Sequence, residues 1–397
     1  MSRHRAMKPL RISAYTVTSA LGCGRQAHVD ALLGERTGLA PQTVETCTLS
    51  TYAGQVAGLE APLGGTQSRW DCRNNRLAQL ALAQDGFRDE VQRRREKHGA
   101  ERIGVFIGTS TSGVQQVELA YRQRDRAADH LPDWFLHRYT QNTFSAADFV
   151  RSTLDLAGPA LAIATACSSS AKVFASARRA IAAGHCDAAI VGGADSLCLT
   201  TLHGFNSLQL ISSEPCRPAD VRRNGLSIGE AAGYALLEPG DGELMLLGYG
   251  ESSDAHHMSA PDPEGRGAIA AMRDALTRAG LEPGQIDYIN LHGTATPAND
   301  LAEDRAIRRV FGRDVSQSST KGWTGHTLGA AGIVEAALSL ICIQEGVLPR
   351  SLNTREKDPA IEGNVLLASR RARVGRVLSN SFGFGGSNCS LIFGGAG

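Results

Sequence analysis

One cysteine in this sequence stands where a nucleophile could be activated. Residues 160–166 are small and mostly apolar, which predicts a strand buried on both faces, and helical spacing follows from Ser168 to Gly184. Cys167 therefore falls at a strand-to-helix turn, where the helix dipole and free backbone N–H groups favour a thiolate and could hold an oxyanion. Because buried cysteines without a chemical role are common, these residues alone leave an inert cysteine as the alternative.

Two histidines and a lysine in the second half of the chain could assist such a nucleophile. His292 ends a predicted strand beside a glycine, and His326 precedes a predicted helix. Lys321 lies five residues before His326, between glycine-rich turns. All but five of the 41 cationic residues are arginine, so a lysine at this position indicates that a compact ammonium group is needed there.

The elements predicted around these residues alternate between helix and strand, which indicates an α/β fold. Residues 74–95 are predicted as one helix and 103–107 as a strand that leads into Gly108-Thr-Ser-Thr111. The same order returns as a helix over 268–279, a strand over 286–291 and the loop Gly293-Thr-Ala-Thr296. This recurrence predicts two copies of one α/β unit, residues 1–240 and 241–397, divided at the turn-rich stretch 238–243.

Composition excludes several classes of protein and partner. The 397 residues include 41 basic and 40 acidic ones, so no overall field attracts nucleic acid. Nine cysteines without paired spacing argue against a disulfide framework and against a zinc site. The longest apolar runs are shorter than the roughly 18 residues of a membrane span, and no targeting segment is recognised. We expect a cytoplasmic protein without a bound metal.

Four motifs, in their order and spacing, resemble those of the β-ketoacyl-ACP synthases of the I/II type. They are Thr165-Ala-Cys167-Ser168, His292-Gly-Thr-Ala-Thr-Pro297, Lys321 with Gly325-His326 and Gly329-Ala-Ala-Gly332, and Ser379-Asn-Ser-Phe-Gly-Phe-Gly-Gly-Ser-Asn388. The resemblance covers essentially the whole chain. It implies the thiolase fold, a five-layered α-β-α-β-α sandwich of two related halves, which is usually dimeric.

The resemblance also implies a reaction. Cys167 would accept an acyl group from acyl-ACP, and His292 and His326 would assist the decarboxylation of malonyl-ACP, with Lys321 orienting His326. The products would be a 3-oxoacyl-ACP and CO2. No cofactor of the chain's own is implied, because the carrier protein brings the phosphopantetheine.

Further site residues follow by position in the motifs. Asp300 and Glu335 would be acidic members of the histidine network, although ordinary helix carboxylates are the alternative for both. The others are Thr294, Thr296 and Phe382, which would contact the pantetheine arm, and Phe384, whose N–H would join that of Cys167 in an oxyanion hole.

The expected partners are an acyl carrier protein, docked at a local basic patch, and a second subunit. The second subunit would be another copy or a related synthase or chain length factor. Basic clusters at 93–97, 122–126, 222–223 and 370–373 are candidates for docking, although most such clusters are solvated helix faces. Primer and chain length stay open, and so does the pathway, which is either fatty acid biosynthesis or a specialised route such as an aryl-polyene or related polyketide pathway.

Two other classes are alternatives. A thiolase would need a second cysteine just ahead of the C-terminal glycine loop, whereas Cys389 follows that loop. A non-catalytic chain length factor would lack the nucleophile, whereas this chain keeps Cys167.

Overall fold

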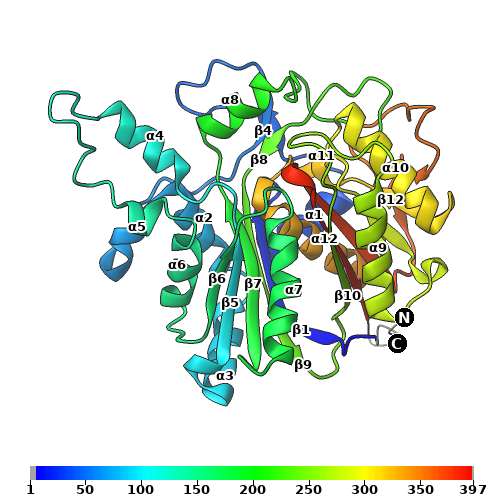
Figure 1. The fold of residues 1–397 in the computed structure, drawn as a ribbon, viewed down its shortest axis with the longest axis horizontal. Coiled ribbons are helices and arrows are strands. Elements are labelled where there is room, and N and C mark those ends of the chain that lie inside the picture. Colours follow the sequence, from blue (N-terminus) through cyan, green and yellow to red (C-terminus); the bar gives the residue numbers. More distant parts are fainter. Residues whose placement is uncertain (1–5, 396–397) are drawn as a thin grey trace.

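Two sets of five strands form the framework of the computed structural model, which describes residues 6–395 (Figure 1). The first set has the spatial order β1 (Leu10–Ser19), β9 (Ala231–Pro239), β7 (Ala188–Asp195), β5 (Ile103–Gly108) and β6 (Ala160–Ile163). The second has the order β10 (Met245–Ser253), β17 (Ser387–Gly394), β16 (Arg376–Gly383), β11 (Tyr288–Asn290) and β12 (Ser316–Ser318), extended by β14 (Asn364–Val365). β1 and β10 pair only near Leu10 and Leu246, which joins the two sets.

The two sets share one topology. In each, the first strand along the chain pairs antiparallel with the last, and the last pairs antiparallel with the fourth. The fourth pairs parallel with the second, and the second pairs parallel with the third. The duplicated unit predicted from the sequence is therefore present, and the predicted boundary at residue 240 falls between β9 and β10.

Helices form three layers around the strands, which completes the expected five-layered sandwich. α7 (Ser169–Ala182) and α12 (Ala331–Glu345) lie between the two strand sets and contact each other. α2 (Arg73–Leu82) and α6 (Ser145–Thr153) cover the outer face of the first set, and α9 (Arg266–Ala279) with α10 (Pro297–Phe311) covers the second. A Cβ at Gly332 would lie 2.4 Å from the backbone nitrogen of Ala171, so glycine is required where α12 crosses α7.

The remaining elements are short and flank this framework. The helices are α1 (Gly24–Leu33), α4 (Val114–Arg122), α5 (His137–Thr140), α8 (Leu199–Ser207) and α11 (Lys321–Thr324), with 3-10 turns η1 (Gly65–Trp70), η2 (Ala100–Arg102), η3 (Pro283–Gln285), η4 (Leu328–Ala330) and η5 (Phe384–Gly386). The strands are β2 (Gly22–Cys23), β3 (Leu39–Pro41), β4 (Tyr52–Gly54), β8 (Ile228–Gly229), β13 (Val347–Leu348) and β15 (Arg370–Arg371).

Two local predictions were wrong. The helix predicted over 74–95 is divided into α2 and α3 (Phe87–His98), because Asp85 and Gly86 take left-handed φ values of 58° and 67° between them. The strand before Cys167 is not buried on both faces. β6 is the edge strand of its set, and Leu161 is 51% exposed.

One helical stretch, Leu328–Glu345, is long and apolar enough to cross a membrane, and 83% of it is buried inside the protein. It consists of η4 and α12, and α12 forms the middle layer of the sandwich together with α7. Its apolar character is accounted for by packing against both strand sets.

Candidate active site

A tight turn between β6 and α7 presents Cys167 to a cavity. Ala166 has a left-handed φ of 52°, and the Thr165 N–H donates to Ser169 Oγ at 2.9 Å across the turn. Ser168 and Ser169 also donate their hydroxyls to the carbonyls of Thr165 and Ala166. The serines that follow the nucleophile therefore fold the turn, and Cys167 is placed at the N-terminus of α7, as expected.

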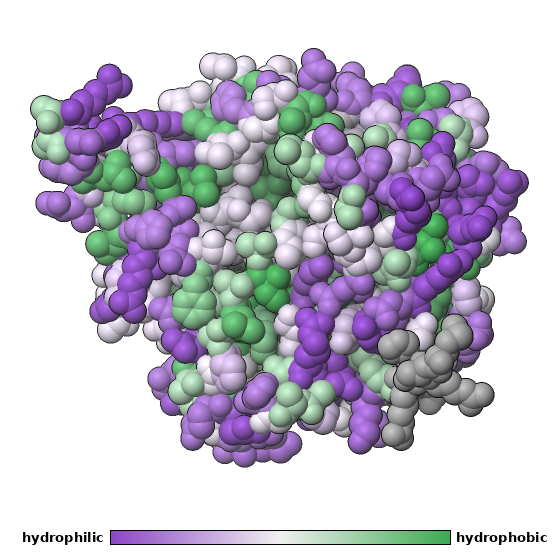
Figure 2. All heavy atoms as spheres, in the orientation of Figure 1, coloured by the Kyte–Doolittle hydropathy of each residue, from purple (hydrophilic) through white to green (hydrophobic). Residues whose placement is uncertain are grey.

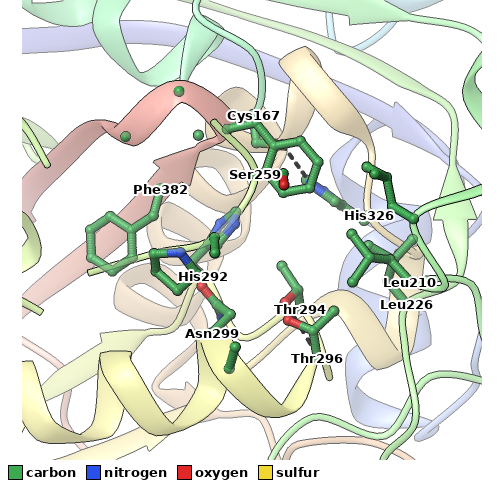
Figure 3. Close-up of a pocket in the computed structure, with 18 of the residues that line it drawn as sticks. Cys167, Leu210, Leu226, Ser259, His292, Thr294, Thr296, Asn299, His326 and Phe382 are labelled. Atoms are coloured by element: carbon green, nitrogen blue, oxygen red, sulfur yellow. Dashed lines mark hydrogen bonds between the residues drawn. The ribbon is translucent and has the colours of Figure 1, made fainter. Parts of the chain in front are cut away.

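His326 is the direct partner of this cysteine. Its Nε2 lies 2.9 Å from Cys167 Sγ (Figure 3). The histidine backbone is held on both sides, since its N–H donates to Ser227 O at 2.7 Å and its carbonyl accepts from Gly229 N–H at 2.9 Å. In the duplicated fold His326 precedes α12 as Cys167 precedes α7, so the two central helices bring the reactive pair together.

The cysteine rests as a thiol, which corrects the expectation of a thiolate. Burial raises the pKa of Cys167 to about 11, and this outweighs the lowering by the Lys321 ammonium and by the Phe384 backbone N–H that donates to the sulfur. Burial, together with the Lys321 charge, lowers the pKa of His326 well below its ordinary value. The resting pair is therefore neutral, and His326 is free to take the proton when the sulfur attacks.

Lys321 orients His292 and not His326, which corrects a second expectation. Its Nζ lies 3.4 Å from His292 Nδ1, donates to the carbonyl of the same histidine, and pairs with Glu335 Oε1 at 2.5 Å. Because the ammonium can only donate, His292 Nδ1 acts as the acceptor and the ring proton is placed on Nε2. Burial, then the charge of Lys321, lowers the pKa of His292 well below its ordinary value, so this ring is also neutral.

Of the two expected acidic residues, one belongs to the histidine network and the other does not. Glu335 lies in the histidine network through Lys321, but Asp300 does not: its carboxylate accepts the N–H groups of Ala219 and Ala295. The carboxylate that holds the His292 loop is Glu303, which accepts the N–H groups of His292 and Gly293, each at 2.8 Å. Its position three residues after Asp300, on the same face of α10, was the only sequence signal for it.

A cavity of about 410 Å³ connects these groups to the surface. Cys167, His292 and His326 line its inner end, and Thr294 and Thr296 line its wall with their hydroxyls 2.9 Å apart (Figure 3). Other lining residues are Phe382, which packs on His292 at 5.8 Å between ring centroids, Phe384, Asn299, Leu210 and Leu226. The structure thus brings together every expected site residue except Asp300.

The arrangement joins a nucleophile, two neutral imidazoles of which one is its base, and a mostly apolar tunnel that carries two threonine hydroxyls, which suits thioester chemistry. Residues 74–242 match the family described as "Beta-ketoacyl synthase, N-terminal domain" and residues 244–355 match "Beta-ketoacyl synthase, C-terminal domain". The chain belongs to the β-ketoacyl synthase family.

Individual relatives agree with this membership. The mitochondrial 3-oxoacyl-(acyl-carrier-protein) synthase of Arabidopsis thaliana is 37% identical over 79% of this chain and 73% of its own length. The 3-oxoacyl-(acyl-carrier-protein) synthase 2 of Rhizobium meliloti is 36% identical over 79% and 78% of the respective chains. A ketosynthase solved in complex with its chain length factor, from Xenorhabdus doucetiae, superposes with a TM-score of 0.90 at 39% identity, covering 98% of both chains.

This β-ketoacyl synthase is thus a condensing acyltransferase of the 3-oxoacyl-ACP synthase class, as the resemblance implied. The thiolase alternative is not favoured by these relatives. The chain length factor alternative is not favoured either, because the Cys167–His326 pair is present and is placed in the cavity.

Proposed function

We propose that this chain condenses malonyl-ACP with an acyl group carried on Cys167, and that the residues act as follows. Cys167 Sγ attacks the thioester carbonyl of acyl-ACP, its proton passes to His326 Nε2, and the carrier thiol leaves with that proton. Malonyl-ACP then binds, its bond to the carboxylate breaks, and CO2 leaves an enolate whose oxygen accepts hydrogen bonds from both imidazoles. The enolate carbon attacks the acyl carbonyl carbon, and the bond from this carbonyl carbon to Cys167 Sγ breaks to release 3-oxoacyl-ACP. The sulfur leaves as a thiolate and takes up a proton from solvent, which restores the thiol.

The observation that carries this proposal is the 2.9 Å contact between Cys167 Sγ and His326 Nε2 in a cavity that His292 also lines. His326 must accept a proton on Nε2 in the first step and donate a hydrogen bond from Nε2 to the enolate oxygen in the second. Its Nδ1 is buried without a hydrogen-bond partner among residues 6–395, so no neighbour fixes its tautomer. His292 needs only to donate a hydrogen bond to the enolate oxygen, and Lys321 holds it in the tautomer whose Nε2 carries the proton.

The tunnel is the proposed path of the pantetheine arm. Thr294 and Thr296 offer hydroxyls to its amides, and the Phe384 N–H, already directed at the sulfur, would stabilise the oxyanion together with the Cys167 N–H. The reaction balances without any further cofactor. All nine cysteines, which lie in the described part of the chain, are free, in keeping with the cytoplasm as the proposed location.

Two of the basic clusters do not suit carrier docking. Arg223 is buried in ion pairs with Asp300 and Asp358. The cluster at 93–97 lies on α3, at the end of the molecule remote from α8 and from the chain segment that carries Phe384 (Figure 1). We propose that the carrier docks on the face around α8, where the cavity opens.

A second subunit is proposed to cover the edge of β6. This strand leads to the nucleophile, and its neighbourhood exposes large apolar side chains, some of them on the projection that carries α4 and α5 (Figures 1 and 2). They are Tyr121, Trp134, Leu136, Phe144 and Leu161. Two related ketosynthases were solved with a chain length factor, at 39% and 27% identity, so we propose a related chain as the second subunit.

The test is a condensation assay on the purified chain, alone and coexpressed with a related chain length factor. Malonyl-ACP is offered with acyl-ACPs of graded length and unsaturation, products are followed by mass spectrometry, and the oligomeric state by light scattering. We expect the wild type to form 3-oxoacyl-ACP and Cys167→Ala to form none. Cys186→Ala should still form it, because Cys186 is a buried cysteine outside the cavity. The absence of product with every primer, in both preparations, would overturn the proposal.

A further inference from the structure

The first Gly-Thr-x-Thr loop of the duplicated unit does not line the cavity, whereas the second does. Gly108-Thr-Ser-Thr111 follows β5 as Gly293-Thr-Ala-Thr296 follows β11. The second loop lines the cavity, whereas the first wraps its hydroxyls around a single carboxylate, Asp195, at the end of β7.

Asp195 is fully buried and accepts hydrogen bonds from six neutral donor groups. Three are hydroxyls, at 2.5 Å from Thr109, 2.6 Å from Ser110 and 2.8 Å from Thr111. Three are backbone N–H groups, at 3.0 Å from Ser110, 2.9 Å from Thr111 and 2.6 Å from Gly329. So many short bonds to one carboxylate fix all of these groups relative to one another.

The groups fixed in this way belong to both sides of the reactive pair. The Thr109 N–H donates to Ile163 O at 3.1 Å, and Ile163 ends the strand four residues before Cys167. Gly329 lies three residues after His326, in the turn that begins α12. A Cβ at Gly329 would approach Asp195 Oδ2 to 2.6 Å, so this contact requires glycine.

His326 depends on such backbone support. Lys321 contacts the other histidine, and the buried Nδ1 of His326 has no hydrogen-bond partner within residues 6–395. The orientation of its ring therefore depends on the backbone at both sides of the residue. The His326 N–H is held by the carbonyl of Ser227, and the turn that follows His326 is held by the bond from the Gly329 N–H to Asp195. The neighbouring Leu328 has a left-handed φ of 55°, which the Gly329–Asp195 bond helps to hold.

We propose that Asp195 is a positioning residue of the condensation site, which ties the turn carrying His326 to the strand that leads to Cys167 and so sets the sulfur-to-Nε2 contact. The inference rests on the proposed roles of Cys167 and His326. It gives the first Gly-Thr-x-Thr loop a function, as the clamp around Asp195.

The test compares Asp195→Asn with Asp304→Asn. Asp304 is the matched control, since it is also a buried carboxylate that accepts two backbone N–H groups, from Glu362 and Gly363, but it lies outside the cavity lining. In Asp195→Asn we expect kcat to fall by about ten- to a hundredfold, the size of a displacement near 1 Å. KM for malonyl-ACP should stay within about twofold, since the pantetheine loop is untouched. Asp304→Asn should leave both constants of the folded fraction unchanged.

The second readout is the pH dependence of Cys167 acylation. In the wild type the rate should not change between pH 7 and 9, because neutral His326 takes the proton. In Asp195→Asn it should rise with pH, as for a thiol that has lost its base, while Lys321, Glu335 and His292 still face the site unaltered. A folded Asp195→Asn protein with wild-type kcat and a flat profile would overturn the inference.

Two further arrangements keep the result interpretable. If Asp195→Asn does not fold, Thr111→Val takes its place, because it removes one of the hydroxyl donors to Asp195. It should lower kcat and make the acylation rate rise with pH, both to a smaller extent than Asp195→Asn. A Thr111→Val protein with wild-type kcat and an acylation rate that does not change with pH would also count against the clamp. If the wild type is not acylated by any acyl-ACP, the proposed function fails, but alkylation of Cys167 by iodoacetamide still reports the pH profile in both variants.

Discussion

Replacement of His326 by alanine should convert a pH-independent acylation into one limited by ionisation of the thiol. In the wild type His326 Nε2 lies 2.9 Å from the sulfur. Since its pKa lies well below the ordinary value, the imidazole is neutral and able to accept a proton throughout the range from pH 7 to 9. The rate of Cys167 acylation should therefore be flat over that range.

Without the base, only the thiolate present at equilibrium can react. The pKa of Cys167 is raised to about 11, so at pH 8 roughly one molecule in a thousand carries a thiolate. This deficit lies within the ~10²- to 10⁴-fold that a general base usually contributes. We expect acylation of His326→Ala to be about a thousandfold slower than wild type at pH 8, with the deficit shrinking about tenfold for each pH unit gained.

Rapid quenching of the protein with an acyl-ACP, followed by intact mass measurement, gives the acylation rate at each pH. His185→Ala is the control, because His185 is an exposed histidine just beyond the C-terminal end of α7, the end opposite Cys167, and should leave the flat profile unchanged. A His326→Ala protein that is acylated at the wild-type rate, or whose deficit does not change with pH, would refute the assignment of His326 as the base.

Three more predictions follow from the surrounding contacts. Lys321→Met leaves the Glu335 carboxylate buried and unpaired, so the free energy of unfolding should fall by about 3–5 kcal/mol in denaturant titrations. The double variant Lys321→Met with Glu335→Leu should recover most of this lost stability, while malonyl decarboxylation stays impaired. Thr294→Val and Thr296→Val should each raise KM for malonyl-ACP about fivefold with kcat little changed, as for the loss of one hydrogen bond near 1 kcal/mol; an effect on kcat alone would contradict the tunnel assignment. Burial raises the pKa of Glu303 from 4.5 to about 7, so the folded state holds this proton more tightly than the unfolded chain does. The free energy of unfolding should therefore fall by about 3 kcal/mol between pH 4.5 and 7, and Glu303→Gln should lose that dependence. If the free energy of unfolding varied with pH in the same way in Glu303→Gln and in the wild type, Glu303 would not titrate in that range.

The local setting of the nucleophile was predictable from the sequence, because it depends on neighbouring residues. A small apolar run followed by helical spacing placed Cys167 at a strand-to-helix turn, and the recurrence of helix, strand and Gly-Thr-x-Thr revealed the duplication. The break in the helix over 74–95 was missed, although Asp85-Gly86 is a known turn dipeptide. The error on β6 has another cause: its side chains suit burial, but the described chain does not cover them.

The partners within the site could not be read from the sequence, because they join loops distant along the chain. Lys321 lies five residues from His326 and 29 from His292, yet it contacts His292. Asp300 and Glu303 share one face of α10, and only the three-dimensional path of the His292 loop shows which carboxylate holds it. Asp195 carries no motif, and its importance rests on contacts with segments 84 to 134 residues away.

The central claim is that condensation proceeds through an acyl group on Cys167 of this chain. Intact and peptide mass spectrometry of the protein after mixing with acyl-ACP tests this claim directly, with malonyl-ACP added in a second step. We predict an adduct of the acyl mass on the peptide that contains Cys167, which malonyl-ACP discharges as 3-oxoacyl-ACP and CO2. Formation of 3-oxoacyl-ACP without that adduct, or by Cys167→Ala at an undiminished rate, would contradict the account.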